Sequence, residues 1–304
     1  MGWRLNREAQ SIRVGSCHEW GIAGAKAQLL AAGRGTAQAG NFVAVEGVSS
    51  ARFLDAPEPA TLHDAGWLWQ VFDRADWRPR TADRLQFNVG LSRSAFEIAN
   101  TFDQEDAGQD QQQRQTSRNV AAGWERQVHG DGLFEARAWV RGDDVRYGGS
   151  PDPLRDRPAS LSQRRRIDNR GVRVVLTYGR GRHTLKAGGQ AAWTFLDEDF
   201  TTAITDGSFN APGSPGFLPA LVPFDLTRGG APFAFQGRGR IAQAAAYLEE
   251  TWARGGWTLT SGVRLDVYRG LSADQGWQPR VNLARRLKRV VARVAYGRIF
   301  LTPY

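Results

Sequence analysis

The connections along this chain alternate between tight turns and long loops. Tight turns fall near residues 78–83, 129–131, 179–182 and 254–256, and the long loops span residues 51–66, 100–117, 148–166 and 199–239. An antiparallel meander with its tight turns at one end and its long loops at the other is typical of an outer-membrane β-barrel. The pattern predicts an all-β chain that forms part of a transmembrane barrel.

The segments between these connections have a period of two. Leu85, Phe87 and Val89 alternate with the polar residues Arg84 and Gln86. Because successive side chains on a strand point to opposite faces, each such segment has one apolar and one polar face. A barrel would turn the apolar face toward lipid, whereas a soluble β-sandwich would bury it. A soluble β-rich protein that binds glycans is therefore the alternative.

Two features favour the barrel. Arg, Asp and Glu stand in the middle of the polar faces, which a lumen tolerates. Segments such as 83–98 and 131–147 are about three times the usual soluble strand of roughly five or six residues. The expected outward belt includes Leu85, Phe87, Val89, Trp257, Leu259 and Val263, and the arginines expected to point inward are Arg84, Arg137, Arg173 and Arg264.

The meander is expected to contain about 11–12 strands, ten of them after residue 67. Residues 41–304 are assigned to the partial barrel. Residues 1–40 are a poorly defined N-terminal segment, and the possibility that they are not native barrel stays open. The start Met1-Gly2-Trp3-Arg4 lacks the basic-then-apolar pattern of a signal peptide. Because an outer-membrane protein must be exported, a true start upstream is expected.

Composition narrows the function classes. No run of eighteen apolar residues exists, which excludes a transmembrane helix. The net charge is +9, but the arginines are scattered among 31 acidic residues and no nucleic-acid-binding motif accompanies them. We therefore expect no nucleic-acid partner. The single Cys17 excludes an internal disulfide and a multi-cysteine zinc site.

The residues that could carry chemistry are dispersed. His18, His63, His129 and His183 lie far apart in the sequence, so we expect no catalytic or metal role. The acidic run Asp197-Glu198-Asp199 could bind calcium, but solvated carboxylates at a strand end are the expected outcome. We expect the same for Asp103, Glu105, Asp106 and Asp110.

Two arginine-containing motifs have structural explanations. Arg164-Arg165-Arg166 is expected to be a charged loop end, with contact to lipopolysaccharide phosphates as the alternative. Gly179-Arg180-Gly181-Arg182 lacks the Gly-Lys-Ser/Thr ending of a phosphate loop and is expected to be a hairpin turn. No hydrolase, metalloprotease or paired-carboxylate motif appears. We predict no enzymatic activity, no cofactor and no metal site.

Residues 242–304 resemble part of the barrel of a TonB-dependent outer-membrane receptor. Residues 259–268 contain Gly262, Arg264, Asp266 and Tyr268 in the spacing of the family's "GxRxDxY" strand. Residues 278–283 (QPRVNL) are similar to the "PR" strand that follows, and residues 296–303 (YGRIFLTP) to the next element, "YGxxFxxP". Residues 41–58, 208–215 and 224–230 resemble the carboxypeptidase-regulatory-like, Oar-like branch. Tyr304 is similar to a terminal aromatic assembly signal only in part, because Pro303 precedes it.

The resemblance implies a receptor in the outer membrane of a Gram-negative bacterium. Such a receptor binds a scarce nutrient, for example a siderophore, cobalamin or a glycan, and imports it with energy transmitted by TonB through a plug domain. The implied partners are outer-membrane lipid and lipopolysaccharide, the TonB system and a small nutrient ligand. The chain supplies about half of the family's roughly 22 strands and shows no plug or TonB box. It is therefore expected to be truncated at both ends. A passive porin-like channel is a further alternative.

Overall fold

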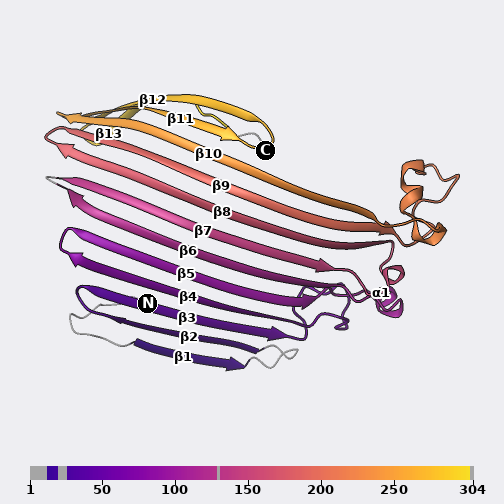
Figure 1. The fold of residues 1–304 in the computed structure, drawn as a ribbon. Helices are drawn as coiled ribbons and strands as arrows, with labels where there is room; N and C mark the ends of the chain where they lie inside the picture. The colour runs from indigo at the N-terminus through magenta and orange to yellow at the C-terminus, as the bar shows by residue number, and fades with distance from the viewer. Residues whose placement is uncertain (1–11, 20–25, 129–130, 302–304) are drawn as a thin grey trace.

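The computed structural model describes residues 12–19, 26–128 and 131–301, which form a single sheet (Figure 1). Thirteen strands are hydrogen-bonded in chain order from β1 to β13, every neighbouring pair antiparallel. The strands are β1 (Ile12–Glu19), β2 (Lys26–Gly35), β3 (Ala39–Ser50), β4 (Gly66–Arg80), β5 (Asp83–Glu97), β6 (Gln112–Val128), β7 (Gly132–Gly148), β8 (Ala159–Arg180), β9 (His183–Ile204), β10 (Phe233–Arg254), β11 (Trp257–Arg269), β12 (Ala273–Leu287) and β13 (Val290–Gly297).

Short helices occur only in the long connections of the described chain. They are α1 (Phe102–Asp106) and the 3-10 helices η1 (Pro153–Arg155), η2 (Pro219–Phe224) and η3 (Leu226–Arg228). None of the helices in the described residues is long and apolar enough to cross a membrane. The all-β antiparallel meander predicted from the sequence is confirmed.

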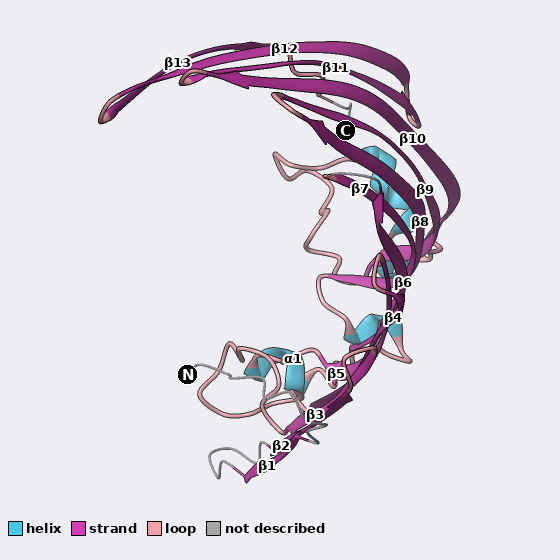
Figure 2. Ribbon diagram, turned by 90° about the vertical axis from the view of Figure 1, so that its left-hand side faces the viewer, coloured by secondary structure: helices cyan, strands magenta, loops and turns pink. Residues whose placement is uncertain are grey.

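The sheet curves into an open trough (Figure 2). Among the described strands, β1 and β13 are its two edges, and no pairing joins them. The connections between β4 and β5, β8 and β9, and β10 and β11 are tight and lie at one end of the sheet, called the turn end. The longer connections gather at the opposite, loop end, where several fold over the concave side (Figures 1 and 2).

The strand register sorts the side chains into two faces. Cross-strand partners point to the same side of a sheet, so Leu85, paired with Trp77 and Trp124, shares its face with the other expected belt residues. Arg84 lies on the opposite face, where it forms an ion pair with Asp76; Arg84 Nη2 is 3.0 Å from Asp76 Oδ1. The predicted separation of apolar belt and arginines is confirmed.

The polar face is the concave one, called the inner face below. Phe53, in the loop after β3, stacks on the inner-face residue Phe96 with 5.3 Å between ring centroids. Phe224 of η2 packs edge-on against the inner-face residue Phe233 at the same distance. Because these loops fold over the concave side, the apolar belt covers the convex, outer face (Figure 2).

Almost no hydrophobic core exists between the described strands. Only five apolar residues are buried: Val175, Ala203, Ile204, Ala245 and Tyr268. Phe87 is 45% exposed and Val294 75% exposed, both on the outer face. A soluble sandwich would bury these side chains in a dry centre. The described sheet therefore lacks the buried apolar layer of a sandwich, and its apolar side chains stay exposed on the outer face.

The strands are more numerous and longer than the sequence indicates. The 13 strands include β1 and β2, where the sequence has no clean period, and both pair in register with their neighbours. The strands β8, β9 and β10 each have 22 residues and extend into the expected loops 148–166 and 199–239. The loop ends of these strands are rich in Arg, Asp and Glu, a composition that predicts a loop from the sequence alone. In the structure these charges form cross-strand ion pairs, such as Arg238 with Asp197.

Two exceptions to strict alternation have a packing explanation. Trp139 points to the inner face, where its indole covers Gly171 on the neighbouring strand and its Nε1 donates to Asn169 Oδ1 at 2.9 Å. Val175 is buried on the same inner face. The inner face is therefore not uniformly polar, because a curved sheet crowds side chains on its concave side.

Candidate ligand-binding site at the loop end

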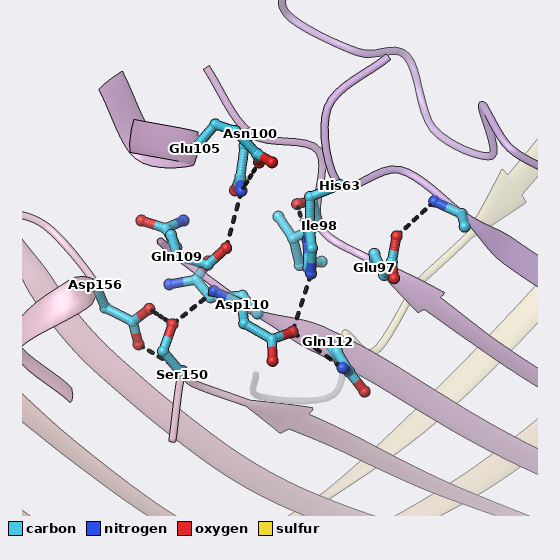
Figure 3. Close-up of polar contacts among 12 residues, drawn as sticks. His63, Glu97, Ile98, Asn100, Glu105, Gln109, Asp110, Gln112, Ser150 and Asp156 are labelled. Carbon is cyan, nitrogen blue, oxygen red and sulfur yellow. Dashed lines mark hydrogen bonds and ion pairs between the residues drawn. The ribbon is translucent and has the colours of Figure 1, made fainter. Parts of the chain in front are cut away.

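Four long connections of the described chain lie at the loop end: residues 51–65, 98–111, 149–158 and 205–232. The polar contacts that join three of these loops are drawn in Figure 3. Their side chains are held by hydrogen bonds rather than by an apolar core, so the arrangement depends on a few buried polar residues. Such loops on a rigid sheet are the usual place for binding residues.

Asn100 organises the second of these loops. Asn100 is fully buried, and its Nδ2 donates to Glu105 Oε2 and to the Gln109 carbonyl, both at 2.9 Å. Its backbone N–H donates to the Leu62 carbonyl in the first loop. The intervening helix α1 begins at Thr101 with a capping box: the Thr101 hydroxyl accepts from the Gln104 N–H, and the Gln104 side chain accepts from the Thr101 N–H.

His63 joins the first loop to the second. Its Nδ1 lies 3.0 Å from the Ile98 carbonyl and its Nε2 lies 3.0 Å from Asp110 Oδ1 (Figure 3). Burial disfavours the charged ring, but the hydrogen bonds to Ile98 and Asp110 and the charges of Glu97 and Asp110 outweigh it and raise the pKa of His63 above 6.5. The imidazolium can donate from both nitrogens, so protonation strengthens this contact.

The third loop is fixed by a buried carboxylate. Asp156 is fully buried and accepts hydrogen bonds from the Ser150 N–H at 3.0 Å and the Ser150 hydroxyl at 2.5 Å. The Ser150 hydroxyl oxygen in turn accepts from the Asp110 N–H at 2.7 Å. A continuous chain of contacts thus runs from His63 through Asp110 to Asp156 (Figure 3).

A pocket of about 690 Å³ lies between α1 and the third and fourth loops. Its lining residues are Asp103, Gln104, Asp106, Ala107, Gln109, Arg155, Arg157, Pro158 and Asp206. This volume falls within the range of small-molecule sites, roughly 300–1,000 Å³. Carboxylates and guanidinium groups face one space, so the pocket can hydrogen-bond a polar or zwitterionic ligand.

The connections that line this pocket also carry exposed apolar side chains. Phe102 and Leu154 are about half exposed, as are Phe209 and Leu218 of the fourth loop. From the sequence, Asp103 and Asp106 are expected to be solvated; they line a pocket only because distant loops fold onto α1. No sequence signal identifies Arg155 or Arg157 as their neighbours.

A second hollow, of about 540 Å³, lies along the middle of the sheet and is lined by both apolar residues, such as Phe72, and polar ones. Glu46, Gln70, Ser92 and Ser117 occupy successive register positions across β3 to β6. Gln70 donates to Glu46, and the Ser117 hydroxyl donates to Asp143 Oδ1 at 2.6 Å. This part of the inner face therefore combines a row of hydrogen-bonding side chains with apolar surface.

The remaining candidate residues are dispersed or paired. Asp197 pairs with Arg238 at 3.2 Å and Glu198 with Arg165 at 2.8 Å, on opposite faces of β9. No group of three or more metal-ligating side chains occurs among the described residues. His183 lies at the turn end beside Glu250. His129 and Tyr304, and the side chains of Cys17 and His18, lie outside the described residues.

The family-like strand places its motif on the inner face. Gly262, Arg264, Asp266 and Tyr268 are successive inner-face positions of β11. Arg264 Nε donates to Asp266 Oδ2 at 2.7 Å, and Tyr268 is buried. A side chain at position 262 would be too close to the neighbouring strand, because a Cβ there would lie 2.9 Å from the Leu248 carbonyl oxygen. The hairpin expected at Gly179–Arg182 is also present, with Gly181 at a φ of +61°.

Residues 53–304 match the family described as TonB dependent receptor-like, beta-barrel. The chain belongs to this family. No curated protein sequence matches it.

Solved structures support the same fold at low sequence identity. A copper transporter, OprC, superposes with a TM-score of 0.65 at 15% identity, covering 97% of this chain and 45% of that one. The ferripyoverdine receptor of the outer membrane of Pseudomonas aeruginosa gives 0.62 at 11%, covering 97% and 43%. The siderophore receptor PiuA from Acinetobacter baumannii gives 0.59 at 9%, covering 91% and 47%. The chain thus spans less than half of the length of these proteins.

The His63 contact predicts a pH dependence of loop order. The pKa of His63 is higher in the folded protein than its ordinary value. The stabilisation that protonated His63 gives to the loops is therefore fully present below about pH 6.5 and is lost as the pH rises through the folded-state pKa. Hydrogen-exchange protection factors, corrected for intrinsic rates, should therefore be higher for residues 98–111 at acidic pH than at alkaline pH. His63→Asn, which tolerates the φ of +50° at this position, should remove the difference. Equal pH dependence in both proteins would contradict the assignment.

Proposed function

We propose that this chain is a wall segment of an outer-membrane receptor that binds a scarce nutrient at its loop end and imports it with TonB-transmitted energy. The observation that carries the proposal is the pocket between α1, the third loop and the fourth loop, which opens at the loop end of a family-typical sheet. The apolar outer face would contact lipid, and the polar inner face would contact a plug domain.

The ligand class is a small, polar, metal-bearing or zwitterionic nutrient. Three aspartates and two arginines line the pocket, and the same connections carry exposed aromatic and aliphatic side chains, a combination that suits a ligand with both charged and apolar parts. The fold-level neighbours named as a copper transporter and as siderophore receptors support this class. The location would be the Gram-negative outer membrane.

Binding to the reconstituted chain tests the proposal. The chain would be refolded into lipid vesicles and titrated, by tryptophan fluorescence, with ferric citrate, ferrichrome, Cu²⁺ and cyanocobalamin. We expect saturable binding of at least one probe. Arg157→Gln or Asp103→Asn should weaken it about tenfold or more, because a hydrogen bond to a charged group is lost. Asp274→Asn, an exposed carboxylate outside the pocket, should have no effect. No saturable binding, or unchanged affinity in the pocket variants, would refute the site.

A further inference from the structure

The pocket of about 690 Å³ at the loop end, here called the loop pocket, has lining residues with hydrogen-bonded polar neighbours. Four of them lie next in sequence to such a residue. These neighbouring pairs are Gln109 and Asp110, Arg155 and Asp156, Arg157 and Asp156, and Asp206 and Thr205. The contacts that fix the polar neighbours therefore also fix the backbone from which the lining side chains project.

The polar neighbours are joined across three loops by hydrogen bonds. From Asp110 in the second loop, the contacts pass through the Ser150 hydroxyl to Asp156 in the third loop (Figure 3). They continue into the fourth loop, because the Thr205 hydroxyl donates to the Asp156 carbonyl. The Thr205 backbone N–H also donates to the Pro158 carbonyl at 3.1 Å. Asp110, Ser150, Asp156 and Thr205 are called the loop network below.

Most of the loop network is buried. Ser150, Asp156 and Thr205 are all less than a tenth exposed. A buried donor or acceptor that loses its partner cannot turn to water instead, so breaking one contact is costly. Because the contacts share their members, we expect order in one loop to favour order in the next.

His63 connects the first loop to the end of the loop network. Its two ring nitrogens face two hydrogen-bond acceptors, the Ile98 carbonyl and the Asp110 carboxylate, each at 3.0 Å. A neutral imidazole has one N–H and one bare nitrogen, so in either tautomer one of these contacts joins two acceptors. Only the imidazolium donates to both. Loss of one proton therefore weakens the attachment of the first loop to Asp110 or to Ile98.

The charged groups around His63 favour the same protonated ring. Asp110 faces the ring from the second loop, and Glu97 at the end of β5 adds a second negative charge nearby. Asp64, the next residue of the first loop, accepts from the Leu54 N–H at 2.8 Å. The Asp110 side chain is 46% exposed, so the contact lies at the end of the loop network that solvent protons can reach.

We propose that His63 is a positioning residue of the loop pocket, and that its doubly protonated ring orders the third and fourth loops through the loop network. The proposal rests on the receptor function above, because it concerns the regulation of the same pocket. His63 does not line the pocket, so it acts on a ligand only through these loops. A ligand is accordingly held more tightly in acidic than in alkaline surroundings.

Hydrogen exchange of the unmodified chain in lipid vesicles tests this coupling without a ligand. The informative amides are those of Arg155, Asp156 and Thr205, which donate to carbonyls of the third loop and lie outside the contacts of His63. Their protection factors, corrected for intrinsic rates, should be about tenfold higher at pH 5.5 than at pH 8.5, a range that includes the ordinary imidazole pKa of about 6.5. Equal protection at the two pH values would overturn the proposal.

Matched variants assign the effect to one histidine. His63→Asn cannot gain a proton in this range, so it should abolish the pH dependence at the third and fourth loops. His183→Asn removes a histidine at the turn end, beside Glu250, and should leave the pH dependence unchanged. A pH dependence that persists in His63→Asn, or that disappears in both variants, would overturn the assignment to His63.

Ser150→Ala tests the route of the coupling, and it keeps the proposal testable if His63→Asn does not fold. The variant removes the hydroxyl that joins the second loop to the third. Residues 98–109 should keep their pH dependence, because the contact between His63 and Asp110 remains. The pH dependence at Thr205 should be lost. If Thr205 keeps it, the loop network is not the route, and the proposal is wrong.

Ligand titration separates this inference from the proposed function. Cyanocobalamin and ferrichrome, whose net charges do not change between pH 5.5 and pH 8.5, would be titrated at both pH values. A probe that binds should have about tenfold higher affinity at pH 5.5 in the unmodified chain and equal affinities in His63→Asn. Binding with equal affinity at both pH values would overturn this inference alone. Absence of saturable binding would count against the proposed function, and the exchange measurement would still decide the coupling.

Discussion

Phe87→Arg is expected to destabilise the lipid-embedded sheet by about 2–4 kcal/mol, the cost of an arginine near the middle of a barrel's lipid-facing band. Phe87 lies on the outer face of β5, with apolar belt residues on both sides along the strand. Its replacement would put a charge into hydrocarbon. Urea unfolding of the chain in lipid vesicles, followed by tryptophan fluorescence, measures the effect.

Gln86→Arg is the control for this prediction. Gln86 is the preceding residue on the same strand and points to the inner face, where it pairs in register with Asp76. An arginine there meets water and a carboxylate, so the free energy of unfolding should change by less than about 0.5 kcal/mol. A larger loss from Gln86→Arg than from Phe87→Arg would mean that the two faces have been assigned the wrong way round.

Gly171→Ala is expected to cost about 1–3 kcal/mol, although it adds a single methyl group. A Cβ at this position of β8 would lie 2.2 Å from Cζ2 of Trp139 on the neighbouring strand. The indole cannot simply move away, because its Nε1 donates to Asn169 Oδ1. The variant must therefore displace the ring or break this hydrogen bond. The same vesicle unfolding assay measures the loss.

Gly90→Ala provides the comparison. Gly90 also lies on the inner face, but the nearest atom to an added Cβ would be Asn119 Cβ at 3.8 Å, an ordinary contact. Replacing a strand glycine where space exists should be neutral or stabilising by up to about 1 kcal/mol. Similar losses at both positions would show that general loss of glycine, and not the Trp139 contact, controls the stability.

Much of the sheet was predictable because its signal is local. The separation of Phe87 from Arg84 follows from alternation along one strand, and the GxRxDxY pattern at Gly262–Tyr268 has a short, ordered spacing. Strand ends were less predictable. Arg164 and Arg238 fall in segments predicted to be loops, because nothing along the chain shows the partner strand that pairs with them.

The loop pocket was not predictable from local patterns. Asp103 and Asp106 share it with Arg157 and Asp206, which are separated from them by about fifty to one hundred residues. His63 likewise appears as an isolated histidine until the second loop brings Asp110 within 3.0 Å. These contacts form only when the loops fold over the sheet. The residues of one loop do not show which other loop it will contact.

By itself the sequence determined the period of the strands, the alternation of tight and long connections and the presence of one apolar face. These properties are set by neighbouring residues, since side-chain direction alternates along any strand. Only the tertiary structure decided which charges share a face, which loops enclose a pocket and where the apolar belt ends along each strand. Those properties depend on register and curvature, and they arise only when thirteen strands are aligned side by side.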